Sequence, residues 1–236
     1  MTKRGLYLQG GGTKGAYQAG VLSAFSERKV QFEAISSTSI GSITGYFVAT
    51  NQFDELKYEW LNMIFPDSET TEDGLFFNNE FLLDILKKYS VKNLTVNHWY
   101  VNYAVVNNQL MENRYEDLID SSSEDRLKYI DYSSKLPIRD ENKKFDLNLY
   151  EGMNIDGGLI NNAFVEPLLD LDFDEIIVIP LNNEFDESKF KMFKGKVTVM
   201  YPPKSFKPGD TTKIDKKFIS EWFKIGYEEG MKMKHS

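Results

Sequence analysis

Residues 9–42 read QGGGTKGAYQAGVLSAFSERKVQFEAISSTSIGS, and this stretch decides the fold. A short apolar strand at residues 5–8 leads into a glycine loop, Gly10 to Gly15, which opens a helix. A second strand follows and ends on Ser37-Thr38-Ser39-Ile40-Gly41. The alternation of strand, helix, strand and helix predicts an α/β fold with a mostly parallel central sheet and helices on both faces.

Hydrophobic patterning predicts further elements of the same kind along the chain. The expected strands are residues 5–9, 32–38, 99–106, 175–180 and 196–201. The expected helices are residues 16–28, 40–49, 79–88 and 215–232. Two polar stretches, residues 66–78 and 107–146, interrupt this pattern, and such segments usually lie on the surface.

Two separate parts of the sequence provide the groups that an acyl-transfer site needs. A glycine loop at the start of a helix presents unpaired backbone N–H groups that can hold an anion. Ser39, in a sharp turn between a strand and a helix, presents an exposed hydroxyl. Asp156 lies far downstream, and the glycines after it allow close approach to other backbone. A serine, amide donors and a carboxylate together indicate a nucleophile that faces an oxyanion hole.

Three blocks of sequence give the chain a resemblance to the patatin-like phospholipases. They are residues 10–20, 38–41 and 156–162, and they occur in that family's order. The resemblance is anchored at residues 3–50 and 154–169. It implies a three-layer α/β/α domain, a serine-aspartate dyad, and a lipid or other acyl ester as the substrate. It also implies that the two polar stretches shape the mouth of the substrate site.

The resemblance implies a role for each site residue. Ser39 is the expected nucleophile, and Asp156 is the expected proton acceptor. The expected oxyanion hole consists of the backbone N–H groups of Gly10, Gly11, Gly12 and Thr13. The expected supporting residues are Lys14, Gly15, Ser37, Gly41, Gly157 and Gly158.

Neither histidine of the chain suits the role of a catalytic base. A serine hydroxyl is a poor nucleophile unless a neighbouring base takes its proton. His98 adjoins a predicted strand among aromatic residues, and His235 lies one residue from the end of the sequence. We therefore expect no catalytic role for either, which leaves Asp156 as the base.

Two positions depart from the family's pattern. Ser37 stands two residues before the nucleophile, where the usual turn has a glycine, so its side chain must fit a tight turn. Phe164 stands where relatives commonly have a proline after an Asn-Asn pair. The first departure concerns the geometry of the nucleophile, and the second concerns only the shape of a loop.

Length and composition limit the remaining possibilities. At 236 residues, with 41% hydrophobic and 27% charged residues, the chain suits a single catalytic domain over residues 1–236. No apolar run approaches the roughly 18 residues of a membrane span, and no secretory segment is recognisable, so a cytoplasmic location is expected. The chain has no cysteine, which excludes disulfides and thiolate metal sites. We expect neither a metal nor an organic cofactor.

Charge is unevenly distributed along the chain. The net charge of −8 disfavours nucleic acid as a partner, because phosphates demand a basic surface. From Lys191 onward there are eleven lysines and five acidic residues, a local net charge of +6. Phe206, Phe218, Trp222 and Phe223 lie in the same segment. It suits peripheral contact with an anionic membrane, and it also suits the solvated face of a terminal helix.

Other interpretations of the same motifs stay open at this level. Gly10-x-Gly12-x-x-Gly15 also fits a dinucleotide-binding fingerprint, but the second strand ends without the acidic residue that holds a ribose. A Walker loop does not fit, because Ala16 and Tyr17 follow Gly15. The same catalytic groups also suit an acyltransferase, or a module that keeps the fold only for binding. Sequence does not separate hydrolysis from transfer, and it leaves the oligomeric state unknown.

Overall fold

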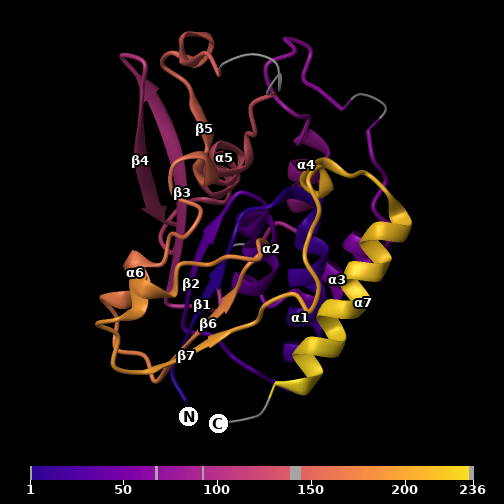
Figure 1. The fold of residues 1–236 in the computed structure, drawn as a ribbon, viewed down its shortest axis with the longest axis vertical. Helices are drawn as coiled ribbons and strands as arrows, with labels where there is room; N and C mark the ends of the chain where they lie inside the picture. Colours follow the sequence, from indigo (N-terminus) through magenta and orange to yellow (C-terminus); the bar gives the residue numbers. More distant parts are fainter. Residues whose placement is uncertain (1, 67–68, 92, 139–144, 234–236) are drawn as a thin grey trace.

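One sheet runs through the molecule, with its strands in the order β4-β3-β2-β1-β6-β7 and β5 added beside β3 (Figure 1). The strands are β1 (Arg4–Leu8), β2 (Ala34–Thr38), β3 (His98–Asn107), β4 (Leu110–Asp117), β5 (Asn154–Asp156), β6 (Glu175–Ile179) and β7 (Lys196–Val199). Pairing is parallel from β3 to β7, whereas β4 and β5 run antiparallel to β3. This computed structural model describes residues 2–66, 69–91, 93–138 and 145–233.

Helices pack around the sheet. They are α1 (Gly15–Glu27), α2 (Ile40–Ala49), α3 (Phe53–Asn62), α4 (Glu80–Lys88), α5 (Ser123–Ser134), α6 (Glu166–Leu169) and α7 (Lys216–Lys232). Within the described ranges, none of them combines the length and the apolar character needed to cross a membrane.

Both faces of the sheet are covered, as the sequence predicts, but they are covered unequally. Alternate residues of a strand face opposite sides. Leu6 and Leu8 of β1 therefore join the larger core beneath α1, α2, α3 and α7, whereas Tyr7 joins a second core with Phe164 and Leu168. The second face is covered by α6, a short 3-10 turn and loops. The predicted α/β architecture with a mostly parallel sheet is confirmed.

Helix α7 packs against α1 with almost no space between the two backbones (Figure 1). A Cβ atom on Gly20 would lie 2.0 Å from the carbonyl oxygen of Phe223. A Cβ on Gly226 would lie 2.1 Å from the carbonyl oxygen of Tyr17. Glycine at both positions therefore allows the terminal helix to join the core that supports the first helix.

All nine predicted elements occur, with ends within two residues of the expected ones. The prediction for residues 107–146 needs correction, because this stretch contains β4 and α5 rather than only surface loop. Helix α5 has few apolar residues on its buried face. There, Arg126 donates hydrogen bonds to the carbonyl oxygens of Leu118 and Val91, and Ser133 is fully buried. A helix that buries polar groups gives no clear hydrophobic period.

The contact between α1 and α7 gives a stability prediction. We expect Gly226→Ala to lower the free energy of unfolding by about 1–3 kcal/mol, because the new methyl group forces the helices apart and this outweighs the better helix propensity of alanine. Urea denaturation followed by circular dichroism measures the change. Ser220→Ala, at an exposed position of the same helix, should stay within about 0.5 kcal/mol of the parent. Equal stability of Gly226→Ala and the parent would contradict the packing described.

Candidate active site

Ser39 lies in the turn between β2 and α2 and has an unusual backbone conformation. Its φ is 55° and its ψ is −127°, a region that residues with a side chain rarely adopt. The turn is tight because α2 begins against β1, where a Cβ on Gly41 would lie 2.2 Å from the carbonyl oxygen of Leu8. The backbone N–H of Ser39 donates to Ser133 Oγ of α5 at 2.8 Å. Surrounding contacts thus hold the residue in a strained position.

Asp156 lies at the end of β5, and the structure brings it into contact with Ser39. The Ser39 hydroxyl donates a hydrogen bond to Asp156 Oδ2. The other carboxylate oxygen, Oδ1, accepts from the backbone N–H of Gly158 at 2.7 Å. The two residues are only 9% and 3% exposed. The carboxylate is therefore held in a position from which it can take the proton of the hydroxyl.

The glycine loop passes directly over Ser39, and its first glycine is attached to the loop that follows Asp156. The N–H of Gly10 donates to Asn162 Oδ1 at 2.9 Å, and Asn162 Nδ2 donates back to the carbonyl oxygen of Gly10 at 3.2 Å. The amide of Gly10 is thereby used, so the prediction that it is an oxyanion donor is revised. Gly10 instead joins the two loops.

The next three amides of the loop differ from that of Gly10. Within the described parts of the chain, the N–H groups of Gly11, Gly12 and Thr13 donate no hydrogen bond. Gly12 and Thr13 open the short 3-10 turn η1 (Gly12–Lys14), whose first amides have no partner inside the turn. These groups line the same pocket as Ser39. They are available to bind a negatively charged oxygen there.

A segment near the end of the sequence, residues 202–215, supports the glycine loop from outside, and we call it the C-terminal strap. Gly12 has φ +57°, and a Cβ on it would lie 2.0 Å from the carbonyl oxygen of Thr211. Thr13 Oγ1 donates to the carbonyl oxygen of Asp210 at 2.6 Å. The strap thus fixes Gly12 and Thr13, two of the three residues whose amides have no partner within the described residues.

Lys14 and Gly15 lie at the junction of the glycine loop, the strap and α2. Burial lowers the pKa of Lys14, and the nearby carboxylate of Asp210 opposes this shift. Lys14 Nζ lies 5.5 Å from the centre of the Phe206 ring in the strap. A Cβ on Gly15 would lie 2.8 Å from the Ile40 side chain, so glycine is needed for α1 and α2 to meet.

Asn102 of β3 joins the end of β2 to the loop that follows Asp156. Its Oδ1 accepts from Thr38 Oγ1 at 2.7 Å, and its Nδ2 donates to the carbonyl oxygen of Asn161 at 3.1 Å. A Cβ on Gly157 would lie 2.5 Å from the carbonyl oxygen of Asn102. Glycine at this position lets the Asp156 loop lie directly on the strand. No pattern in the sequence indicates this role for Asn102.

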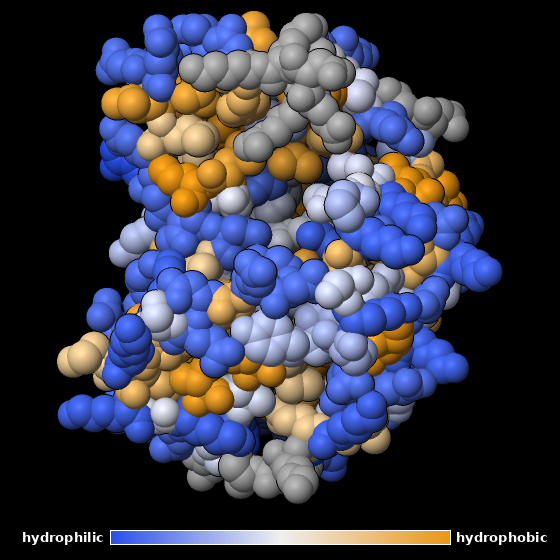
Figure 2. Space-filling model, in the orientation of Figure 1, coloured by the Kyte–Doolittle hydropathy of each residue, from blue (hydrophilic) through white to orange (hydrophobic). Residues whose placement is uncertain are grey.

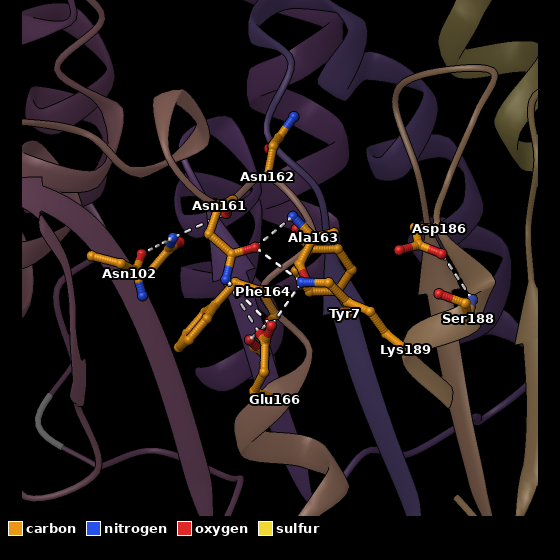
Figure 3. A network of polar contacts seen from close by, with 12 residues as sticks. Tyr7, Asn102, Asn161, Asn162, Ala163, Phe164, Glu166, Asp186, Ser188 and Lys189 are labelled. Carbon is orange, nitrogen blue, oxygen red and sulfur yellow. Dashed lines mark hydrogen bonds and ion pairs between the residues drawn. The ribbon is translucent and has the colours of Figure 1, made fainter. Parts of the chain in front are cut away.

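The loop beyond Asp156 is also anchored on its outer side (Figure 3). Lys189 Nζ donates to Asn161 Oδ1 at 3.2 Å and to the carbonyl oxygen of Ala163 at 2.7 Å, and it forms an ion pair with Glu166 at 2.7 Å. Asn161 and Asn162 therefore have different partners. Asn162 faces the glycine loop, and Asn161 faces this surface network.

The two departures from the family's pattern have simple structural explanations. Ser37 lies within β2, before the turn, and its Oγ accepts from Trp99 Nε1 at 3.0 Å and donates to the carbonyl oxygen of Tyr100 at 3.3 Å. The strained position is Ser39, so a side chain at Ser37 meets no backbone restriction. Phe164 is buried in the second core, where its ring centre lies 5.2 Å from that of Tyr115.

A pocket of about 270 Å³ opens above Ser39 and Asp156. Most of its wall is hydrophobic, formed by Trp60, Met63, Phe65, Phe77, Phe81, Leu82, Leu136, Leu159 and Ile214. Glu69 and Asn78 come from the first polar stretch, and Ser134 comes from the second. The proposed role of those stretches in substrate choice remains a prediction.

Neither histidine is found in the pocket among the residues that the structure describes. His98 begins β3, where its Nδ1 lies 2.6 Å from Asp117 Oδ2 and its ring stacks on Tyr100. His235 lies outside the described residues. No group of three or more His, Asp or Glu side chains close enough to hold a metal ion occurs in residues 2–66, 69–91, 93–138 and 145–233. The expectation of no cofactor remains a prediction.

Comparison with known proteins identifies a family for this chain. The sequence model of the family described as patatin-like phospholipase matches residues 6–169. A search of curated proteins finds no matching sequence. Among solved structures, VipD from Legionella pneumophila aligns with 98% of this chain and 66% of its own, at 12% identity and a TM-score of 0.45. A chain of the heterodimeric ExoU–SpcU complex from the type III secretion system of Pseudomonas aeruginosa aligns with 98% of this chain and 51% of its own, at 12% identity and a TM-score of 0.48. This chain thus spans between about half and two thirds of those chains.

The strained conformation of Ser39 gives a prediction about stability. Ser39→Gly should have a free energy of unfolding about 1 kcal/mol higher than Ser39→Ala, because glycine adopts a positive φ without strain. Thermal melts of the two variants test this. The same pair of substitutions at Ser220, inside α7, should give the opposite order, since glycine weakens a regular helix. If Ser39→Gly is the less stable of the two at position 39, the turn is not strained.

The bonds between Asn162 and Gly10 give a prediction about reactivity. Asn162→Ala leaves the buried Gly10 peptide without its partner, and we expect fluorophosphonate labelling of Ser39 to slow by about 10–100-fold as the loop loses its position. Asn161→Ala is the matched control, since its side chain bonds to the surface network instead. Intact mass spectrometry measures the labelling rate of each variant. Equal rates for Asn162→Ala and Asn161→Ala would argue against a positioning role for Asn162.

Proposed function

This chain belongs to the patatin-like phospholipase family, and we propose that it is a serine acyl hydrolase acting on phospholipids, lysophospholipids or related lipid esters. In this proposal Ser39 is the nucleophile and Asp156 is the proton acceptor. The hydrogen bond from Ser39 Oγ to Asp156 Oδ2, within a largely hydrophobic pocket, is the observation that carries it.

The first half of the reaction transfers the acyl group to the enzyme. Ser39 Oγ attacks the ester carbonyl carbon while its proton passes to Asp156. The oxygen of the tetrahedral intermediate becomes negative, and we assign its stabilisation to the N–H groups of Gly11 and Gly12, with Thr13 beside them. One such donor typically contributes about 3 kcal/mol to the transition state. Asp156 then returns the proton to the departing alcohol.

The second half releases the acid. A water molecule gives its proton to Asp156 and attacks the acyl carbon, and Ser39 recovers its proton as the ester bond breaks. Burial supports this chemistry, because a carboxylate with an ordinary pKa near 3.9 is a weak base in water and needs an exact position and a dry surrounding to act. Gly158 gives Asp156 that position by binding its other oxygen.

The shape of the pocket supports a lipid as the substrate. Its aromatic and aliphatic walls suit an acyl chain, whereas a dinucleotide needs a carboxylate at the end of the second strand for its ribose. In this chain Thr38 and Ser39 occupy that end. The dinucleotide interpretation therefore lacks its main polar contact.

Labelling with a fluorophosphonate tests the proposal. We expect one adduct on the parent protein, located on Ser39 by peptide mass spectrometry, and none on Ser39→Ala. Asp156→Asn keeps the shape of the side chain and the bond from Gly158 but loses the base, so labelling should slow by about 10²–10⁴-fold. Release of fatty acid from a panel of lipid esters should fall in parallel.

The control is Ser90→Ala, which removes an exposed serine that does not line the pocket and should be labelled like the parent. Equal labelling of the parent and Ser39→Ala would refute the assignment of the nucleophile. Full activity of Asp156→Asn would refute the assignment of the base.

A further inference from the structure

Two exposed hydrophobic side chains belong to segments that line the pocket. Ile64 is 81% exposed and stands between Met63 and Phe65, which both line the pocket. Ile214 of the C-terminal strap lines the pocket itself and is 38% exposed. Exposed aliphatic surface has an unfavourable hydration free energy. We call these two side chains the rim, and their exposed surface gains by contact with an apolar phase.

Lysines lie beside this rim. Lys213, Lys216 and Lys217 are exposed and form no ion pair with any residue that the structure describes. Two acidic groups of the same segment are already engaged, since Asp215 Oδ1 accepts from the N–H of Phe218, and Glu221 pairs with Lys204. Lys213 and Lys217 add only a weaker electrostatic interaction with Glu221. In Figure 2, hydrophobic and hydrophilic residues lie next to each other along the edge where α7 begins.

The position of two of these lysines is unfavourable for the helix itself. Lys216 and Lys217 are the first two residues of α7. A helix N-terminus carries partial positive charge, so each cation there is unfavourable for the helix. An anionic surface in front of the helix would reverse the sign of this effect. The arrangement is thus poor for an isolated domain and good for one that is bound to negative charge.

We propose that Ile64, Ile214, Lys213, Lys216 and Lys217 form a docking surface for an anionic lipid membrane, an inference that rests on the proposed lipid hydrolase function. The chemistry of the surface favours this occupant. Aliphatic side chains suit shallow insertion between acyl chains, and lysines suit lipid headgroups. The chain as a whole has a net charge of −8, so only a face that gathers positive charge can approach such a membrane.

Docking through this surface sets the direction in which substrate enters. The rim residues border the pocket, so contact at the rim places the mouth against the lipid. A lipid then moves from the bilayer to Ser39 past hydrophobic walls without crossing water. This adds a source of substrate to the proposed reaction, because the enzyme draws on a membrane that contains anionic lipid.

Sedimentation with vesicles tests the proposal in the Ser39→Ala protein, which cannot digest the vesicles. Binding to vesicles of phosphatidylcholine mixed with phosphatidylserine should exceed binding to phosphatidylcholine alone, and it should weaken as salt is added. Adding Lys216→Glu and Lys217→Glu should weaken binding by about 20-fold or more, since each lysine near the surface contributes about 1 kcal/mol. Ile64→Glu should also weaken it.

Matched controls lie on the opposite face of the sheet. Lys191→Glu with Lys194→Glu gives the same change in net charge, and Met192, 91% exposed, provides Met192→Glu as the control for Ile64→Glu. These variants should bind vesicles like the parent. The proposal is overturned if the control variants weaken binding as much as the rim variants do. It is also overturned if the protein binds neither type of vesicle, or binds both types equally well.

The vesicle experiment and the labelling experiment fail independently. A soluble fluorophosphonate reacts with Ser39 without vesicles, so labelling of the parent tests the catalytic site alone. Vesicle binding of Ser39→Ala tests the docking surface alone. A labelled protein that ignores anionic vesicles would keep the proposed function and remove the docking surface.

Discussion

The arrangement of the site depends on strand β3, because two shorter strands, β2 and β5, both pair with it. On a single edge of β3, Thr38 at the end of β2 pairs with Asn102, and Asp156 at the end of β5 pairs with the next residue, Tyr103. Because β2 runs parallel to β3 and β5 runs antiparallel to it, the last residue of β2 and the last residue of β5 lie next to each other. The chain must leave the sheet after each of these two residues. Ser39 and Asp156, 117 positions apart in the sequence, become neighbours through this register, and Asn102 holds the junction with its side chain.

A second constraint is the attachment of the glycine loop at both of its ends. Asn162 holds Gly10 from one side, and residues 210 and 211 of the C-terminal strap hold Thr13 and Gly12 from the other. Loops that bind a transition state must not rearrange when it forms, because rearrangement costs free energy at the moment of reaction. Within the described residues, the amides of Gly11, Gly12 and Thr13 have no hydrogen-bond partner, while the contacts of Gly10, Gly12 and Thr13 keep the loop in position.

Most of the fold, together with Ser39 and the glycine loop, could be predicted from the sequence, because these depend on local patterns, whereas Asp156 stood out only through the resemblance to the family. A glycine loop between a strand and a helix, or a serine at the end of a strand, can be recognised from a few neighbouring residues. Asn162, Ser133 and Asn102 could not be assigned in this way. Each is a polar residue of a common type, and its importance arises from a partner between 64 and 152 positions away. The same reasoning explains why α5 was missed, since its buried face is polar.

The strap also has a consequence for the synthesis of the protein. The glycine loop is made about 200 residues before residues 210–214 of the strap, which support it and close one side of the pocket. During synthesis, Ser39 and the loop are therefore present long before the pocket has all of its walls. Until the strap has been made, Gly12 and Thr13 lack the contacts that hold them in place.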